Sequence, residues 1–264
     1  INNMSKKKKS YYTEFYKDLK SIPVLKISDY KKNILFKQRE NFYNSININI
    51  NYFKDKKILE IGPGNGVNAF YLLNNKIKHI TLVDNNRSAL NECRKILKKF
   101  KSKVTFINQD IFEFNTNTKF DYIICENILP NFSNPEVILK KLKKNLVHNG
   151  YLVFTCSDNF GLFSEKLRGI ISKLILSKYD FNSYNKKFSK KNLSKFSFET
   201  KILRSEFKLH LNKLKSNTRK IDSWIQDNVL NDKWWTGKKY LAFDKAINFL
   251  SGNKKIDTVF WSSS

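Results

Sequence analysis

A glycine-rich segment with an acidic residue near its start is the part of this chain best suited to hold a charged small ligand. Residues 58–66 read Ile-Leu-Glu-Ile-Gly-Pro-Gly-Asn-Gly, so that Gly62, Gly64 and Gly66 follow a short apolar run. Glycine is needed where the backbone must turn tightly and approach a ligand closely. The dinucleotide-binding pattern is GxGxxG, and Val67 stands where its third glycine would fall. The loop alone indicates a nucleotide-type ligand, and its spacing argues against a dinucleotide.

Glu60 lies two residues before the first glycine and places a carboxylate beside this loop. The helix expected after the loop begins with free N–H groups and the positive end of its dipole, which attract a phosphate or a carboxylate. A carboxylate at this position would repel a pyrophosphate, but it suits an ammonium group. Together these features favour S-adenosylmethionine (SAM), whose methionine end carries both an ammonium and a carboxylate.

Three more acidic residues follow later strand-like runs, in the order expected for one ligand lying along the edge of a sheet. Asp84, with Asn85 beside it, ends the second run and can accept hydrogen bonds from both ribose hydroxyls. Asp110 follows the third run and can accept from the adenine amino group, while Ile111 packs on the ring. Glu126 closes the fourth run, near the reacting end of the cofactor. Each acid alone could be a helix cap or a turn residue, so the inference depends on the set.

Repeated alternation of strand and helix patterns explains how these residues would come together. The expected strands are apolar runs at 57–61, 79–84, 103–108, 122–126 and 151–157. The expected helices between them span 65–75, 87–101 and 135–147. Continuous apolar strands that alternate with helices predict an α/β fold with a doubly wound, mostly parallel sheet covered on both faces. Such sheets bind ligands at the carboxyl ends of their strands, where all four acids are expected.

The flanking regions have different patterns, and they divide the chain into three parts. Residues 1–54 hold a Lys-rich tail followed by one or two helices, and residues 55–160 form the expected core. Residues 161–264 are expected to form a mostly helical cap around the substrate. This cap would contain helices near 162–178, 190–214, 217–230 and 241–251, a polar loop at 179–191 and a returning strand at 256–261.

The chain resembles the class I, Rossmann-like SAM-dependent methyltransferases over roughly residues 55–160. The resemblance is carried by the motifs at 60–66, 83–84, 109–111 and 121–126. It implies an enzyme that uses SAM and releases S-adenosylhomocysteine. It also implies that Glu60 and the three glycines surround the methionine part, that Asp84 holds the ribose and that Asp110 holds the adenine.

The same resemblance implies a sheet of about seven strands, the last of them antiparallel, and 256–261 is the candidate for a late strand. The long helical region after the fifth strand departs from the family pattern. That departure leaves the methyl acceptor undefined by the family core.

Methyl transfer from a sulfonium is an in-line displacement that needs positioning and, for some acceptors, a base. Glu126 is the first candidate base, although a role in positioning SAM is slightly favoured. His210 is the second candidate, and its apolar neighbours also fit a packed core histidine. Arg219 and Asp222 lie three apart on an expected helix, where they could bind substrate or form a surface salt bridge. No Cys/His cluster suggests a metal site.

A net charge of +27 invites a nucleic-acid partner, but the composition favours another explanation. Arginine, which reads bases and phosphates through its planar fork, occurs at only six positions: 39, 87, 94, 168, 204 and 219. The abundance of Lys, Asn and Ile is typical of the codon bias of an AT-rich genome. The Asn/Asp-Pro-Pro-aromatic motif of amino-methylating nucleic-acid enzymes is missing after Glu126, and Cys125 lacks the preceding Pro of carbon-5 pyrimidine enzymes.

Three functions therefore remain open. The favoured one is a bacterial, cytoplasmic methyltransferase that acts on an O or N atom of a small molecule or of a glycan or natural-product precursor. The second is an RNA methyltransferase whose Lys-rich segment at 186–191 holds the phosphate backbone. The third is a SAM-binding protein without catalysis. The cytoplasmic location is expected because no apolar run of 18 residues and no signal-peptide pattern is found, and because the three cysteines form no CxxC pair.

Overall fold

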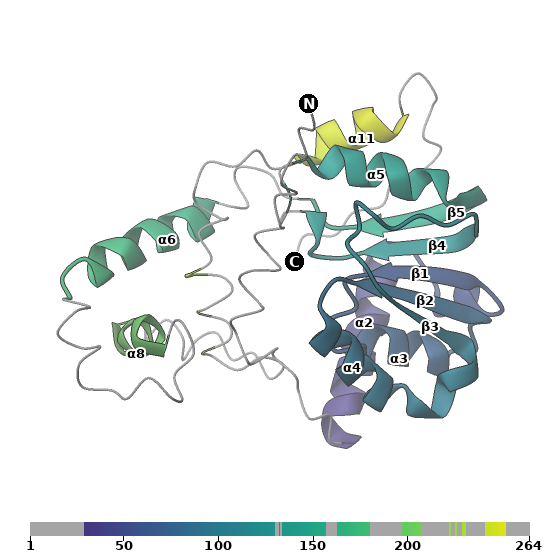
Figure 1. The fold of residues 1–264 in the computed structure, drawn as a ribbon, viewed down its shortest axis with the longest axis horizontal. Coiled ribbons are helices and arrows are strands. Elements are labelled where there is room, and N and C mark those ends of the chain that lie inside the picture. Colours follow the sequence, from purple (N-terminus) through teal and green to yellow (C-terminus); the bar gives the residue numbers. More distant parts are fainter. Residues whose placement is uncertain are drawn as a thin grey trace, which may run out of the picture.

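A parallel β-sheet of five strands forms the centre of the described part of the protein (Figure 1). The computed structural model describes residues 29–129, 132, 134–156, 163–179, 197–206, 222, 225, 229–230 and 241–251. The strands are β1 (Lys57–Ile61), β2 (His79–Asp84), β3 (Val104–Asn108), β4 (Phe120–Cys125) and β5 (Leu146–Phe154). Their order across the sheet is β3-β2-β1-β4-β5, and all four neighbouring pairs are parallel. The predicted doubly wound α/β core is therefore confirmed.

The expectation of about seven strands is wrong for the described residues, which hold five. After β5, the described chain forms the helices α6 (Phe163–Leu176), α8 (Ser197–Glu206) and α11 (Phe243–Ser251). In α6 the large apolar residues recur every three or four positions, which is a helical period rather than a strand period. The strand expected at 256–261 lies outside the described residues.

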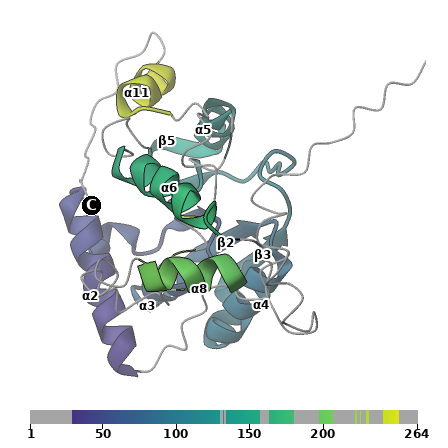
Figure 2. The same cartoon turned by 90° about the vertical axis from the view of Figure 1, so that its left-hand side faces the viewer.

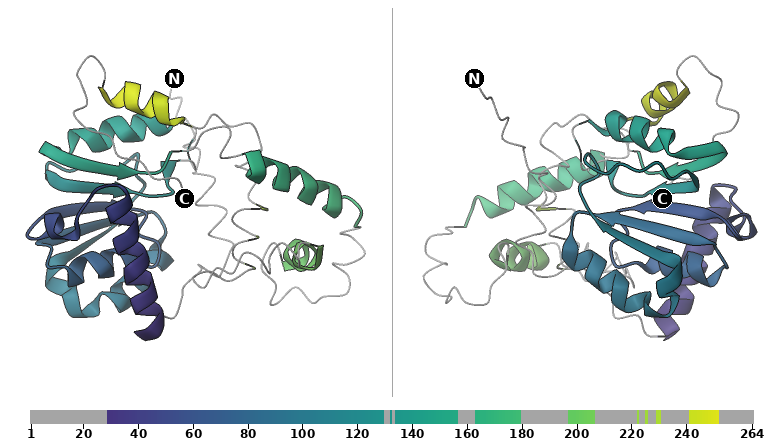
Figure 3. Two further views of the ribbon diagram at one scale, coloured as in Figure 1. Left: turned by 180° about the vertical axis from the view of Figure 1, so that it is seen from behind. Right: turned by 45° about the vertical axis from the view of Figure 1, so that its right-hand side comes forward.

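The helices cover both faces of the sheet, as Figures 1 and 3 show. On one face lie α2 (Asp29–Ser45), α3 (Val67–Asn74) and α4 (Arg87–Ile96), and on the other lie α5 (Pro135–Lys144) and α11. Each face has its own buried cluster, because successive strand residues point to opposite sides. Ile58 packs with the α2–α4 layer, whereas Leu59 packs with the α5 layer.

This alternation fixes the direction of the predicted acids. In β1, Glu60 lies two residues after Ile58 and therefore points to the same face of the sheet. In β2, Asp84 lies two residues after Leu82, which belongs to the same buried cluster as Ile58. In β4, Ile124 pairs with Glu60, and Glu126 follows two residues later. Alternation alone therefore turns the three acids toward the face covered by α2, α3 and α4.

Helix α2 is attached to this face by aromatic packing. Tyr43 is fully buried, and its ring centroid lies 4.9 Å from that of Phe53. Phe53 in turn lies 4.4 Å from Tyr122 of β4, and Phe36 lies 5.6 Å from Phe70 of α3. Edge-to-face and tilted aromatic pairs of this kind add to the free energy of area burial. The helix that precedes the core is thus an integral part of one hydrophobic layer.

Helices α6 and α8 lie on the side to which the carboxyl ends of the strands point (Figures 1 and 2). They share a small buried cluster of Leu203, Ile225 and Val229. Much of α6 is exposed, including the side chains of Phe163 and Leu174. None of the helices in the described ranges is long and apolar enough to cross a membrane.

Candidate cofactor site

The glycine loop joins β1 to α3 and uses the conformational freedom of its glycines. Gly62, Gly64 and Gly66 all have left-handed backbone angles, with φ of 67°, 57° and 78°. Gly62 donates its N–H to the carbonyl of Val83 at 2.9 Å, which ties the loop to β2. A Cβ at Gly62 would lie 2.2 Å from Cδ1 of Ile128, whereas a Cβ at Gly64 would meet none of the described residues within 4 Å. The first glycine is therefore favoured by its left-handed backbone, and a side chain there would also have to displace the end of the Ile128 side chain, whereas the second lies beside open space.

Cys93 of α4 supports the far end of the same loop. Its thiol donates to the carbonyl oxygen of Gly64 at 3.3 Å, and a Cβ at Gly66 would lie 3.0 Å from its sulfur. Burial raises the pKa of the Cys93 thiol, so it stays protonated and able to donate. The sequence pattern showed only that Cys93 is not part of a CxxC pair, and this contact with the loop was not predicted.

Glu60 is a carboxyl group held in the protein interior. Its side chain belongs to a residue that is 5% exposed. One oxygen, Oε1, accepts from the side-chain amide of Asn68 at 3.1 Å, while Oε2 is buried with no hydrogen-bond partner among the described residues. Burial raises the pKa of Glu60 to about 7, against the lowering effect of the Asn68 hydrogen bond. A buried acceptor without a donor is rare in folded proteins, so this oxygen calls for an explanation.

Asp84 lies at the carboxyl end of β2, as predicted. Its Oδ1 accepts the backbone N–H of Asn86 at 2.8 Å, and Asn86 in turn caps the N-terminus of α4. Burial raises the pKa of the Asp84 carboxyl to about 6, although the Asn86 hydrogen bond lowers it. Asn85 lies between these two residues at the same turn.

Asp110 and Ile111 follow β3, the outermost strand on this side. Asp110 accepts the backbone N–H of Phe112 at 2.9 Å and thereby shapes the turn. Ile111 is 5% exposed and packs in the cluster on the α5 face. Its contact with an adenine ring stays a prediction.

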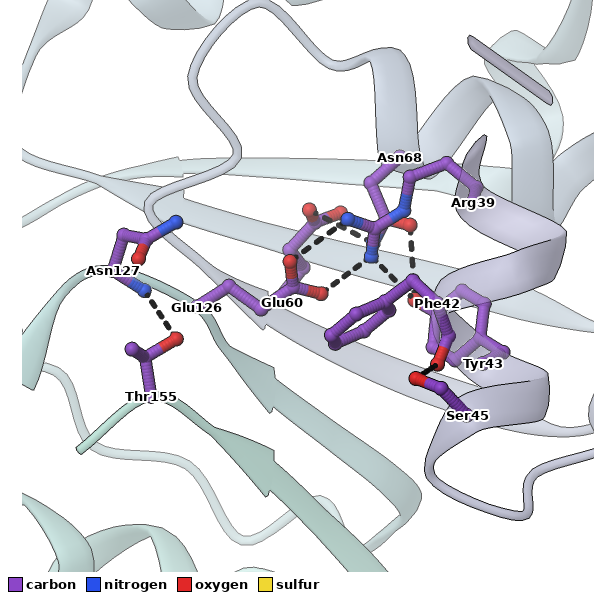
Figure 4. A network of polar contacts seen from close by, with 9 residues as sticks. All are labelled: Arg39, Phe42, Tyr43, Ser45, Glu60, Asn68, Glu126, Asn127 and Thr155. Carbon is purple, nitrogen blue, oxygen red and sulfur yellow. Dashed lines mark hydrogen bonds and ion pairs between the residues drawn. The ribbon is translucent and has the colours of Figure 1, made fainter. Parts of the chain in front are cut away.

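Glu126, the first candidate base, forms a two-point ion pair with Arg39 of α2 (Figure 4). The Arg39 Nη1–Glu126 Oε2 distance is 2.8 Å, and the Nη2–Oε1 distance is 2.5 Å. The guanidinium also lies over the rings of Phe42 and Tyr43, with its carbon 4.7 and 5.0 Å from their centroids. Neutralised in this way, Glu126 is better suited to an electrostatic role than to proton removal.

A chain of hydrogen bonds links this ion pair to Glu60. Arg39 donates to the Tyr43 hydroxyl at 3.2 Å, and Tyr43 donates to the Asn68 side-chain oxygen at 2.9 Å. Asn68 then donates to Glu60. Sequence reasoning missed the roles of Arg39, Tyr43 and Asn68. The available signals were the i, i+4 spacing of Arg39 and Tyr43 and the scarcity of arginine in this chain.

The remaining candidates are not brought to this edge by the described structure. His210 and Arg219 lie outside the described residues. Asp222 forms an exposed ion pair with Arg204 of α8 at 3.1 Å. In the part of the chain that is described, no group of three or more His, Cys, Asp or Glu side chains is arranged to hold a metal ion.

Comparison with known proteins decides the domain family. Residues 53–175 match the family model described as a methyltransferase domain. These residues form a class I SAM-dependent methyltransferase domain. A curated relative of the methyltransferase domain is the malonyl-[acyl-carrier protein] O-methyltransferase of Calditerrivibrio nitroreducens, which is 32% identical over 129 residues. That match covers 48% of this chain and 47% of the relative, so the chain spans about half the length of the protein it matches.

Solved structures share the fold of the methyltransferase domain. PKMT2 from Rickettsia typhi, in complex with AdoHcy, superposes with a TM-score of 0.53 at 19% identity, covering 83% of this chain and 42% of that chain. The N-methyltransferase NodS from Bradyrhizobium japonicum, in complex with S-adenosylhomocysteine, is 20% identical, covers 55% of this chain and 72% of that chain, and has a TM-score of 0.43. The first of these similarities supports the fold of the domain.

Proposed function

We propose that this protein is an active SAM-dependent methyltransferase that transfers a methyl group to an oxygen or nitrogen atom of a small molecule or biosynthetic precursor. The observation that carries the proposal is the buried, unpartnered oxygen of Glu60 beside a glycine loop with an open side at Gly64. An acceptor in that position suits the ammonium group of the methionine end.

The proposed cofactor position follows the carboxyl edge of the sheet from β4 to β3. Glu60, with Gly62, Gly64 and Gly66, would surround the methionine part. Asp84 and Asn85 would hold the ribose. The adenine would lie at the next residues along the edge, Asp110 and Ile111. The order of the strands supports this assignment, because β1, β2 and β3 are neighbours in the sheet.

SAM, when bound, supplies a methyl group activated by a positively charged sulfur. The residues of this chain contribute position and charge. Glu60, when ionised, gives the edge a net negative charge that favours a cationic ligand, and Arg39 holds the carboxylate of Glu126 in one orientation. We therefore assign Glu126 to positioning the donor, and we leave proton removal to the acceptor or to the cap at 161–264.

The acceptor is proposed to lie between this edge and the cap, on the side where α6 and α8 are found (Figure 2). The curated relative is named as an O-methyltransferase of a carrier-bound malonyl group. This name favours oxygen, and a carboxylate in particular, as the first acceptor to test. A carboxylate needs no base, since it is already ionised at neutral pH.

The test is methyl transfer from labelled SAM by the purified full chain. Acceptor panels would contain acyl-carrier-protein-bound dicarboxylates, free small hydroxyl and amine compounds, and total RNA. Label in a small or carrier-bound acceptor, lost in an Asp84→Ala variant, is the expected result. Label in RNA alone would replace this proposal with the RNA alternative. Tight SAM binding with no labelled product in any panel would favour a binding protein without catalysis.

A further inference from the structure

Lysine side chains gather where the neighbouring strands β2 and β3 begin, at the end of the sheet that points away from α6 and α8 (Figure 1). They come from the turn at residues 75–78, which joins α3 to β2, and from the 3-10 helix η2 (Lys98–Lys103), which joins α4 to β3. We call this group the amino-edge surface. Its members are all exposed: Lys76, Lys78, Lys98, Lys99, Lys101 and Lys103.

Hydrogen bonds hold the two segments of the amino-edge surface together. The Lys99 ammonium donates to the side-chain oxygen of Asn74 at 3.1 Å, and the Lys103 ammonium donates to the carbonyl oxygen of Ile77 at 3.4 Å. Lys99 also lies over the ring of Phe100, with its nitrogen 4.6 Å from the ring centroid. The surface is therefore a platform of fixed backbone from which the lysine side chains extend.

The sequence around η2 is strongly unbalanced in charge. Residues 85–108 contain seven basic residues and a single acid, Glu92, whose carboxylate pairs with Lys95 at 2.6 Å. Asp55 lies at the border of the surface, where its N–H donates to the carbonyl of Lys76 at 3.1 Å. The amino-edge surface thus carries a large excess of positive charge.

Lysine is abundant throughout this chain, so the placement of the charges is more informative than their number. In a parallel sheet the strands begin at one edge and end at the other. The acids predicted to bind the cofactor follow the ends of the strands, whereas the amino-edge lysines precede the beginnings of β2 and β3. The sheet therefore has an acidic edge, which suits a cationic cofactor, and a basic edge, which suits an anionic partner.

Two observations indicate the class of anionic partner. Residues 74–103, all of which are described, expose no large apolar side chain that could enter a lipid bilayer. Arg94, one helical turn before Lys98, is exposed, and its guanidinium carbon lies 4.8 Å from the ring centroid of Phe106 while its Nη1 donates to Asn91 at 2.9 Å. A guanidinium held in this way offers a planar group on which a nucleic-acid base can stack.

We propose that the amino-edge surface binds single-stranded nucleic acid, with the phosphate backbone on the lysines and a base against Arg94. A single strand fits better than a duplex, because its bases are accessible for stacking. The strand binds at the end of the sheet opposite the cofactor edge, so it is a partner of the protein and not the methyl acceptor. Binding requires no SAM and therefore does not depend on the proposed function.

The experiment measures binding of the full chain to a fluorescein-labelled 20-nucleotide oligouridylate by fluorescence anisotropy, without SAM. With about six phosphate contacts, the wild type should bind about 300-fold more weakly at 200 mM than at 50 mM salt. A triple variant, Lys78→Gln, Lys98→Gln and Lys101→Gln, loses about half of these contacts. It should bind about 10- to 100-fold more weakly than the wild type at 100 mM salt and should show about half the salt dependence.

A second triple variant is the matched control. Lys140→Gln, Lys143→Gln and Lys144→Gln on α5 remove the same charge from exposed lysines on the opposite face of the sheet. This variant should bind the oligouridylate within about threefold of the wild type, because its lysines lie outside the proposed site. Thermal unfolding checks that both triple variants remain folded.

Arg94→Lys tests whether the surface recognises bases as well as phosphates. It keeps the charge but loses the planar group, so it should weaken oligouridylate binding about 5- to 20-fold. Inorganic polyphosphate, measured as a competitor, has no bases, and its affinity should change by less than about twofold.

Three results would overturn the proposal. The first is absence of oligouridylate binding by the wild type at 100 mM salt. The second is an equal loss of affinity in the two triple variants, which would show that only the net charge of +27 attracts the strand. The third is unchanged oligouridylate affinity in Arg94→Lys. Tighter binding to phosphatidylglycerol vesicles than to the oligouridylate, lost in the amino-edge variant, would replace the nucleic acid with a membrane. Failure to bind S-adenosylhomocysteine would contradict the proposed function alone.

Discussion

The carboxyl edge of the sheet and the α6–α8 pair differ in what they bury. At the edge, a carboxyl group is enclosed at Glu60, and the ion pair between Arg39 and Glu126 is largely shielded from solvent. In α6 and α8, by contrast, apolar side chains are exposed and charged groups are not enclosed. Leu174 is 62% exposed, and the ion pair of Arg204 and Asp222 lies in solvent. Burying charge is costly unless a ligand or partner compensates it.

The difference indicates where specificity for the cofactor and specificity for the acceptor can reside. Buried acids in a fixed backbone are suited to one ligand of defined charge, which fits a cofactor. Exposed apolar helix faces adapt to ligands of varied shape, which fits an acceptor. Substitutions in the two regions should therefore separate effects on stability, on cofactor affinity and on turnover.

The largest effect is expected at Gly62. A Gly62→Val substitution adds a side chain at a left-handed φ of 67° and drives its Cβ to 2.2 Å from Ile128. We expect destabilisation by more than about 3 kcal/mol, from backbone strain and overpacking together. Urea denaturation followed by circular dichroism measures it.

Gly64→Ala is the matched control, since its φ is also positive but its Cβ meets nothing within 4 Å in the described part of the chain. Strain alone should cost about 1–2 kcal/mol, while SAM binding weakens because the new methyl group faces the ligand. Equal destabilisation of the two variants would contradict the distinction between a packing glycine and a ligand-facing glycine.

The next largest effect is expected on cofactor affinity at Asp84. Asp84→Ala should weaken S-adenosylhomocysteine binding by about 100-fold, because two ribose hydroxyls would lose their acceptor. Asp121→Ala is the control. Asp121 lies near the amino end of β4, away from the carboxyl edge of the sheet, and its carboxylate accepts the N–H of Lys57 at 2.8 Å. Calorimetry should show that only the first variant loses affinity. Unchanged affinity in Asp84→Ala would overturn the placement of the ribose.

The predictions at the glycine loop and at Asp84 depend on features that could be recognised in the sequence, because each feature is a short contiguous pattern. Strands β1 and β2 are continuous apolar runs, and the residues that end them are read directly from the order of the chain. The network around Arg39 could not be predicted in the same way. Arg39 and Glu126 are 87 positions apart, and their contact depends on how α2 packs across the sheet. No local pattern records that packing.

The expected count of about seven strands came from the family resemblance rather than from patterns in this sequence, and the described residues hold five. The returning strand at 256–261 was expected from an apolar run and lies outside the described residues. Within the core, β5 begins at Leu146, earlier than the strand expected at 151–157, and it includes the Asn149–Gly150 pair, whose residue types are typical of turns. Asn149 has a φ of 58°, and the pairing with β4 is irregular between Phe120 and Tyr122. The turn-like residues therefore mark an irregularity inside a strand.

The pH dependence gives a third prediction, with opposite signs for affinity and stability. The pKa of Glu60 rises from 4.5 to about 7 in the ligand-free protein, so the folded state holds a proton that the unfolded state releases. Stability without ligand should therefore fall as pH rises from about 4.5 to about 7. Affinity for S-adenosylhomocysteine should rise over the upper part of that range, because the ligand ammonium requires the ionised carboxylate.

Glu60→Gln isolates this group. The neutral amide should make the ligand-free protein more stable than wild type by about 1–3 kcal/mol near pH 8, while ligand affinity falls and loses its pH dependence above about pH 6.5. Thermal unfolding and calorimetry at several pH values measure both quantities. A variant that is less stable at every pH would show that Glu60 serves the fold and not the ligand.

A smaller effect on stability is expected from the exposed face of α6, where Leu174 lies with Phe163, Leu167 and Ile170. Leu174→Ala should change the free energy of unfolding by no more than about 0.5 kcal/mol. Leu139→Ala, in the buried cluster under α5, should cost about 2–5 kcal/mol by comparison. If α6 contacts the acceptor, Leu174→Ala will raise the KM for the acceptor and leave SAM affinity unchanged. Equal losses of stability would remove the contrast between the two regions.

The smallest effect is expected at Asp222, which the sequence analysis gave with Arg219 as a substrate residue or as part of a surface salt bridge. The described structure pairs Asp222 with Arg204, the two side chains are 53% and 58% exposed, and Arg219 lies outside the described residues. Exposed pairs contribute little because solvent screens them, so Asp222→Asn should change stability by less than about 0.5 kcal/mol. Arg204→Gln should then behave in the same way, and both should retain kcat. Suppose instead that kcat falls by more than about tenfold in Asp222→Asn but not in Arg204→Gln, with stability and SAM affinity intact. That result would show that the Asp222 carboxylate acts on the acceptor, because loss of an ion pair that only supports α8 would have the same effect in both variants.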